Sequence, residues 1–128
     1  MNLMLSALIF KINLLTMNQY VIDNFKLKEF GCRTCSEIVL QKELLIRLDI
    51  LRKIYGKTIP ITSAYRNIED NMRVNGEPNS AHLRGAAVDV VLPKNPKRFL
   101  WIARKVFPVV LVNYQRNYAH LQLKFNDY

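Results

Sequence analysis

One aspartate lies inside the most strongly apolar strand-like run of the chain. Residues Ala86–Leu92 read AAVDVVL, a pattern typical of a buried strand, and Asp89 stands at its centre. Burying a carboxylate is costly unless a cation or hydrogen-bond donors compensate for the lost hydration. The fold must therefore bring positive charge or donors to Asp89.

The two histidines of the chain are placed where they could meet that requirement. His82 follows a turn-rich segment, and Gly85 lets the chain fold back so that His82 and Asp89 can reach one point. His120 lies in an alternating run, in which Tyr118, His120 and Gln122 share one face and Ala119, Leu121 and Leu123 the other. Two histidines and an aspartate with an open fourth position for water form a catalytic type of zinc site. Spacing alone leaves a simpler interpretation open, in which the histidines are hydrogen-bonded core or surface residues and Asp89 pairs with an arginine.

The periodicity of the chain predicts an α+β domain with a small central antiparallel sheet and flanking helices. Helices are predicted at Ser36–Tyr55, Asn67–Val74 and Pro96–Phe107, and strands at Ile59–Ser63, Ala86–Leu92, Val109–Tyr114 and Tyr118–Phe125. Gly56 is placed to end the first helix, and Pro60 favours a position at the sheet edge for the first strand.

Residues 1–24 form an apolar N-terminal segment ahead of a single predicted domain at residues 25–128. The uninterrupted run Leu3–Phe10 is shorter than the ~20 residues that a membrane-spanning helix needs, so we expect no stable membrane span. No basic residue precedes the run, unlike in a signal peptide. Met1–Met17 could be a first amphipathic helix, a weak interfacial anchor, or leader sequence upstream of a start at Met17.

Several stretches resemble elements of one enzyme family in the same order. Ser80–Asp89 (SAHLRGAAVD) closely resembles the Ser-x-His-x-x-Gly-x-Ala-x-Asp signature of the zinc D-alanyl-D-alanine carboxypeptidase family, which includes L-alanyl-D-glutamate endopeptidases of phage lysins. Ile61–Arg66 (ITSAYR) is similar to its Ile-Thr-Ser-Gly-Tyr-Arg element, and Tyr118–Gln122 (YAHLQ) to its aromatic-x-His-Val-Asp element. Phe25–Phe30 with Cys32 and Cys35 resembles the start of short, phage-borne members. The resemblance implies a hedgehog/DD-peptidase-like fold.

The resemblance also implies a role for five residues. His82, Asp89 and His120 would be the ligands of one Zn²⁺ per chain. Arg66 would steady the substrate carbonyl and the developing oxyanion, as a fixed guanidinium can. Ser80 is expected to be a turn former that also orients a ligand from the second coordination sphere. Without the resemblance, Arg66 would be interpreted as part of a surface or structural ion pair.

The chain departs from the family at the general base. Such hydrolysis needs a proton acceptor beside the water, and family members carry a carboxylate close to the last histidine. Here the residue two after His120 is Gln122, whose amide cannot take a proton from water near pH 7. Residues 90–126 contain no acidic residue, while Glu69, Asp70 and Glu77 are nearer to the other ligands in sequence. The departure affects turnover more than metal binding, and the general base is not identified.

The net charge limits the kinds of partner that the chain is expected to bind, and the cysteine content limits its redox chemistry. The chain has 19 Lys and Arg against 10 Asp and Glu, a net charge of +9, which favours nucleic acid, anionic lipid or an acidic wall polymer. No zinc-finger, RNP or helix-turn-helix signature supports a specific nucleic-acid partner. Cys32 and Cys35 are expected to be structural rather than redox-active.

These features predict a zinc-dependent peptidase that hydrolyses a peptide bond in the peptidoglycan stem, as a carboxypeptidase or an endopeptidase. A phage lysis or entry enzyme is expected, acting at the bacterial cell wall if exported or released. One alternative is a non-catalytic zinc-containing wall-binding module that has lost its general base. A third interpretation, a basic nucleic-acid-binding viral protein, rests on charge alone.

Overall fold

A four-stranded antiparallel sheet forms the centre of the protein in a computed structural model that describes residues 9–13, 21–22, 25–32, 34 and 37–124. The strand order is β5 (Ile61–Ser63), β6 (Ala87–Val91), β8 (Tyr118–Gln122) and β7 (Val109–Asn113). Two short sheets pair β1 (Ile9–Asn13) with β4 (Glu37–Gln41) and β2 (Val21–Ile22) with β3 (Phe25–Lys26). The predicted α+β class and the edge position of β5 are confirmed.

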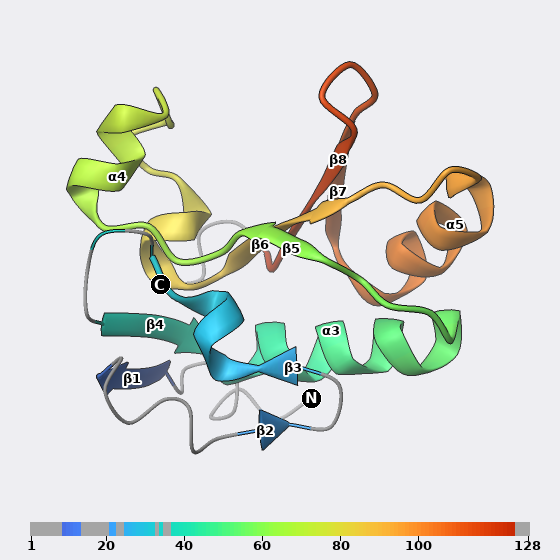
Figure 1. The fold of residues 1–128 in the computed structure, drawn as a ribbon, viewed down its shortest axis with the longest axis horizontal. Coiled ribbons are helices and arrows are strands. Elements are labelled where there is room, and N and C mark those ends of the chain that lie inside the picture. The colour runs from blue at the N-terminus through green and yellow to red at the C-terminus, as the bar shows by residue number, and fades with distance from the viewer. Residues whose placement is uncertain (1–8, 14–20, 23–24, 33, 35–36, 125–128) are drawn as a thin grey trace.

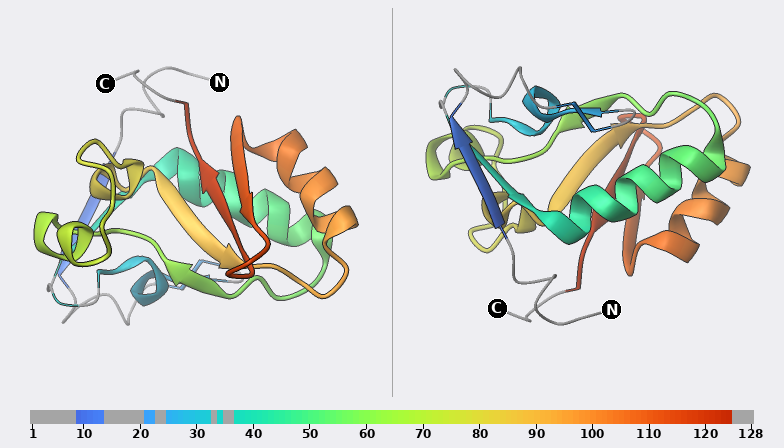
Figure 2. Two further views of the ribbon diagram at one scale, coloured as in Figure 1. Left: turned by 90° about the horizontal axis from the view of Figure 1, so that it is seen from above. Right: turned by 90° about the horizontal axis from the view of Figure 1, so that it is seen from below.

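Two helices build the core against the sheet. The longer helix, α3 (Lys42–Tyr55), lies below the sheet and packs against α5 (Pro96–Val106), as Figures 1 and 2 show. Tyr55 and Phe99 join these helices through an edge-to-face ring contact with centroids 5.1 Å apart. Alternate residues of β6 and β8 fill the same core: Val88, Val90, Ala119 and Leu121. The other face of these strands is left for polar side chains.

Three short helical segments complete the described chain. They are η1 (Leu27–Phe30) and η2 (Ala81–Arg84), both 3-10 helices, and the α-helix α4 (Ile68–Arg73). Figure 1 shows α4 and the turn of the β7–β8 hairpin above the sheet, on the side away from α3. These two features flank the site described below.

The predicted helix over Ser36–Tyr55 is wrong in its first part. Residues 37–41 form β4, and the helix begins only at Lys42. Ile38 and Leu40 are fully buried while Val39 between them is half-buried, which is the period of a strand. The spacing of Leu40 to Leu44 matched a helix by coincidence, because the strand runs directly into it. The helix ends at Gly56 as predicted, with φ +78° and its N–H donated to the Arg52 carbonyl.

The N-terminal segment is described only in part. Ile9–Asn13 form β1, which pairs with β4 in antiparallel register, so a helix does not describe these five residues. Residues 1–8, 14–20 and 23–24 of the predicted segment lie outside the described residues, as does Cys35. No helix in the described ranges is long and apolar enough to cross a membrane.

Candidate metal centre

A tight turn directly before β6 positions His82. Ser80 Oγ accepts a hydrogen bond from the His82 N–H at 3.2 Å, and Gly85 ends the turn with φ +66°. A Cβ at Gly85 would lie 2.1 Å from the Val39 backbone oxygen, so no larger residue fits there. The Gly85 carbonyl accepts from the Gln41 N–H at 3.0 Å, which fixes the turn to β4. Ser80 acts on the His82 backbone, and its effect on the His82 ring stays a prediction.

The sheet places Asp89 beside His120. The two residues face each other in the β6–β8 register, so their side chains leave the sheet on the same side. Ser63 on β5 and Leu111 on β7 extend this row across all four strands. The register therefore brings together two chemical groups that are 31 residues apart in sequence.

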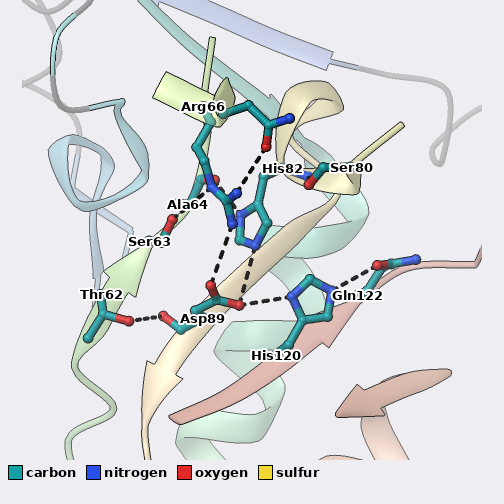
Figure 3. A network of polar contacts seen from close by, with 10 residues as sticks. Thr62, Ser63, Ala64, Arg66, Ser80, His82, Asp89, His120 and Gln122 are labelled. Carbon is teal, nitrogen blue, oxygen red and sulfur yellow. Dashed lines mark hydrogen bonds and ion pairs between the residues drawn. The ribbon is translucent and has the colours of Figure 1, made fainter. Parts of the chain in front are cut away.

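Three potential metal ligands converge on one point, as Figure 3 shows. The Asp89 Oδ1 atom lies 2.8 Å from His120 Nδ1 and 3.3 Å from His82 Nε2. The donor atoms of all three side chains lie within 4.8 Å of one another. His82 is buried, with 1% of its surface exposed, while Asp89 and His120 are half-buried. The three residues predicted from sequence are brought together.

The outer nitrogen of each imidazole is occupied by a neutral acceptor. His82 Nδ1–H donates to the Ala64 carbonyl at 2.6 Å, and His120 Nε2–H donates to Gln122 Oε1 at 2.8 Å. With those protons fixed outward, the neutral rings turn the lone pairs of His82 Nε2 and His120 Nδ1 towards the Asp89 carboxylate. Three electron-rich atoms then point at one space, and a cation there, a proton or a metal ion, would balance their charge. His82 Nε2 has no hydrogen-bond partner of its own among the described residues.

Protons supply part of this positive charge when no metal does. Burial by itself raises the pKa of the Asp89 carboxyl, but its interactions with His120 and His82 outweigh burial, so the net pKa is lowered. Burial lowers the pKa of His120, but its hydrogen bonds to Asp89 and Gln122 outweigh that effect and raise it. Asp89 is therefore ionised, and the site favours a bound cation.

Arg66 lies at the edge of the same cluster. Its guanidinium donates to Ser63 Oγ at 3.3 Å and to Asn71 Oδ1 at 3.0 Å, and it lies 3.7 Å from Asp89 Oδ2. Burial lowers the pKa of Arg66, and the negative charge of Asp89 opposes this change. The Arg66 N–H also donates to the His82 carbonyl at 3.2 Å, which ties the two predicted residues together.

Asn71 is a site residue that the sequence did not indicate. It is buried, with 4% of its surface exposed, and its Nδ2 donates to the Glu77 carbonyl at 2.8 Å while its Oδ1 accepts from Arg66. A Cβ at Gly76 would lie 2.0 Å from Asn71 Oδ1, so the glycine makes room for the amide. The Asn-Gly pair at positions 75 and 76 predicts only a turn. No sequence pattern in this stretch predicts the contact between Asn71 and Arg66.

A cavity of about 870 Å³ opens over the cluster. Its floor holds Asp89, the two histidines and Arg66, and its walls come from residues 70–81 on one side and from the β7–β8 hairpin on the other. This volume lies in the usual range for sites that bind small molecules or short peptides. Four carboxylates line it: Glu29, Asp70, Glu77 and Asp89.

Gln122 contacts the ring of His120 instead of leaving its amide free in the cavity. Its amide oxygen accepts from the outer nitrogen of His120, so the side chain positions that ring. Asp70 is engaged by Thr34 Oγ1 and by Arg73, both at 2.8 Å, and Glu69 is exposed. Among the described residues, Asp89 is the carboxylate that contacts His82 or His120.

Comparison with known proteins assigns the sequence to a family. A sequence model described as Peptidase M15 matches residues 15–122, a range that includes all three candidate ligands, Arg66 and Gln122. No curated protein matches the chain with significant similarity. The match covers most of the chain, from before β2 to the end of β8. The chain therefore belongs to the Peptidase M15 family.

Proposed function

We propose that this protein is a zinc-dependent peptidase that hydrolyses a peptide bond in the peptidoglycan stem, with His82, Asp89 and His120 as the zinc ligands. M15 peptidases are metallopeptidases, which supports a metal-dependent reaction. The observation that carries the proposal is the convergence of three donor atoms within 4.8 Å, with the outer nitrogen of each imidazole already hydrogen-bonded. The stem peptide as substrate follows from the resemblance of Ser80–Asp89 to murein peptidases.

The donor set fits zinc. Two neutral imidazoles and one carboxylate leave a fourth position open, as in catalytic zinc sites. When bound, Zn²⁺ acts as a Lewis acid that polarises a carbonyl and lowers the pKa of water to about 7. The hydrogen bonds from His82 to Ala64 and from His120 to Gln122 hold the rings in the required tautomer before the metal arrives.

Arg66 would bind and orient the scissile carbonyl. Its guanidinium is held from two sides by Ser63 and Asn71, so little conformational freedom is lost when a substrate oxygen binds. Its positive charge faces the cavity floor, where negative charge develops on the carbonyl oxygen during attack. The cavity above it would hold the stem peptide on both sides of that bond.

A non-catalytic zinc-containing module that binds the cell wall is the second candidate. It is favoured by one observation: an amide, Gln122, contacts His120 where an acid could have done so. Such a module would keep the ligands and the cavity and bind stem peptides without cleaving them.

The test combines metal content with cleavage of purified muropeptides. We expect about one zinc per chain by plasma mass spectrometry, and new peptide termini by liquid chromatography and mass spectrometry. Zinc with stem-peptide binding but no cleavage would support the second candidate. Protein without zinc after reconstitution, or with unchanged zinc in the His82→Ala variant, would contradict both.

Asn71→Ala is expected to lower kcat/KM about tenfold, the cost of loosening one charge-assisted hydrogen bond on an oriented donor. Because Arg66 acts on the developing oxyanion, kcat should fall more than KM rises. Gly76→Ala should have the same effect, since its Cβ would displace the Asn71 amide. Steady-state kinetics on a cleaved muropeptide measures both.

Zinc content is the control for these variants, and it should stay unchanged. Asn79→Ala is the matched variant, because Asn79 lines the same cavity with an exposed side chain. Equal losses in the Asn79 and Asn71 variants would show that Asn71 has no specific effect on Arg66.

A further inference from the structure

The two walls of the cavity carry different charges. The wall from residues 70–81 offers Asp70, Arg73 and Glu77. The β7–β8 hairpin contributes Leu111, Val112, Asn113, Arg116 and Tyr118. Figure 1 shows this hairpin rising opposite α4. Arg116 is the only Asp, Glu, Lys or Arg that the hairpin, fully described, adds to the cavity lining.

Arg116 differs from the other two arginines of the cavity. Arg66 lies 3.7 Å from Asp89, and Arg73 lies 2.8 Å from Asp70, so each already faces a carboxylate. For Arg116 the described residues provide no ion pair, and residues 90–124 contain no acidic side chain that could offer one. Its charge is therefore available to a ligand in the cavity.

The hairpin turn holds the Arg116 backbone in place. The Arg116 N–H donates to Asn113 Oδ1 at 2.9 Å, and Asn117 follows in the left-handed region with φ +60°. A fixed backbone with an exposed guanidinium can bind a planar anion through two parallel hydrogen bonds. The aromatic side chain of Tyr118 and the exposed Leu111 line the same wall and offer apolar contact beside that charge.

We propose that Arg116 forms a carboxylate-binding subsite that selects stem peptides by a free carboxylate near the scissile bond. The inference rests on the proposed function, because it names what the same cavity recognises. Two groups of a stem peptide could be this carboxylate: the C-terminal carboxylate of D-alanine and the α-carboxylate that γ-linked D-glutamate leaves free. Amidation of either group removes its charge and replaces one of its two acceptor oxygens with an NH2 donor, so the two parallel hydrogen bonds from the guanidinium are lost.

The experiment compares three synthetic stem pentapeptides on the zinc-loaded protein. One keeps only the D-alanine carboxylate, one keeps only the D-glutamate α-carboxylate, and in the third both are amides. Binding is measured by fluorescence anisotropy and cleavage by mass spectrometry, for the wild type, Arg116→Ala, Arg116→Lys and the control Arg104→Ala. Arg104 is an exposed cation on α5, so its removal changes the net charge equally without touching the cavity lining.

We expect the wild type to bind one of the two acids about tenfold more tightly than the double amide, as for one charge-assisted contact. Which acid is preferred identifies the carboxylate. Arg116→Ala should abolish this preference, Arg116→Lys should keep part of it, and Arg104→Ala should keep it in full. Salt should weaken the wild-type preference, because the contact is exposed.

Two results would overturn the subsite alone, and a third would overturn it together with the proposed function. An unchanged preference in Arg116→Ala would do so while leaving the proposed function intact, since peptides would still bind or be cleaved. If Arg116→Ala and Arg104→Ala lose this preference equally, the preference depends on the net charge of the protein and not on Arg116. If the wild type neither binds nor cleaves any of the three peptides, the proposed function itself fails, and the subsite with it.

Discussion

Replacing His82 by alanine is expected to remove the metal from the purified protein. Mutating a residue in the second coordination sphere already weakens metal binding about 10–100-fold, so losing a ligand should weaken it more than about 100-fold. A metal present at 1,000 times its dissociation constant stabilises the folded state by about 4 kcal/mol. For a chain of this size, that corresponds to a rise in Tm of roughly 10–20 °C. The wild type should lose this increment in EDTA, and the variant should lack it from the start.

The measurements are zinc content and thermal unfolding, each with and without chelator. Because His82 is buried, its loss also leaves the Ala64 carbonyl without a donor, so His120→Ala provides a second test at a half-buried position. Tyr118→Phe is the control, since Tyr118 lines the cavity but offers none of the clustered donor atoms. A chelator-dependent Tm that persists in both histidine variants would place the metal elsewhere.

Much of the sheet and the centre of the site could be predicted from sequence. Asp89 in an apolar run required a buried charge to be compensated, and the alternation around His120 placed that histidine on the polar face of its strand. The alternation around His120 survives folding because a strand exposes alternate residues to opposite faces, and the apolar run around Asp89 is typical of a strand buried in the centre of a sheet. Antiparallel pairing of β6 with β8 then sets Asp89 opposite His120.

The errors and omissions arose where the role of a residue depends on contacts that no sequence pattern specifies. The strand β4 was not predicted, because its pairing partner β1 is distant in sequence and because the leucines continue at helical spacing from Leu40 into α3. Asn71 was missed because its role depends on Arg66 and on the space that Gly76 leaves. Gln122 was interpreted only as the residue in place of an acid, and its contact with the His120 ring was not foreseen. In each case the sequence alone did not determine the role of a residue, and the tertiary structure did.

Gly85→Ala is expected to destabilise the fold by about 3–4 kcal/mol, of which about 1–2 kcal/mol is the cost of a left-handed backbone for alanine. The rest comes from the new Cβ, which would lie 2.1 Å from the Val39 oxygen and 2.8 Å from the Leu40 nitrogen. Backbone cannot yield as a side chain can, so either β4 or the η2 turn must move. That movement would break the bond between the Gln41 N–H and the Gly85 carbonyl.

Gly56→Ala is the matched control for this prediction. Gly56 has a similar φ of +78°, but nothing lies within 4 Å of the position that its Cβ would take. Its replacement should cost only the free energy of the left-handed backbone, about 1–2 kcal/mol. Urea unfolding of both variants in EDTA separates the two contributions without a metal effect. Because η2 carries His82, a displaced turn should also lower zinc affinity in Gly85→Ala and leave it unchanged in Gly56→Ala. Equal destabilisation of the two variants would mean that β4 gives way easily, and that the close approach of Gly85 to Val39 does not constrain the ligand turn.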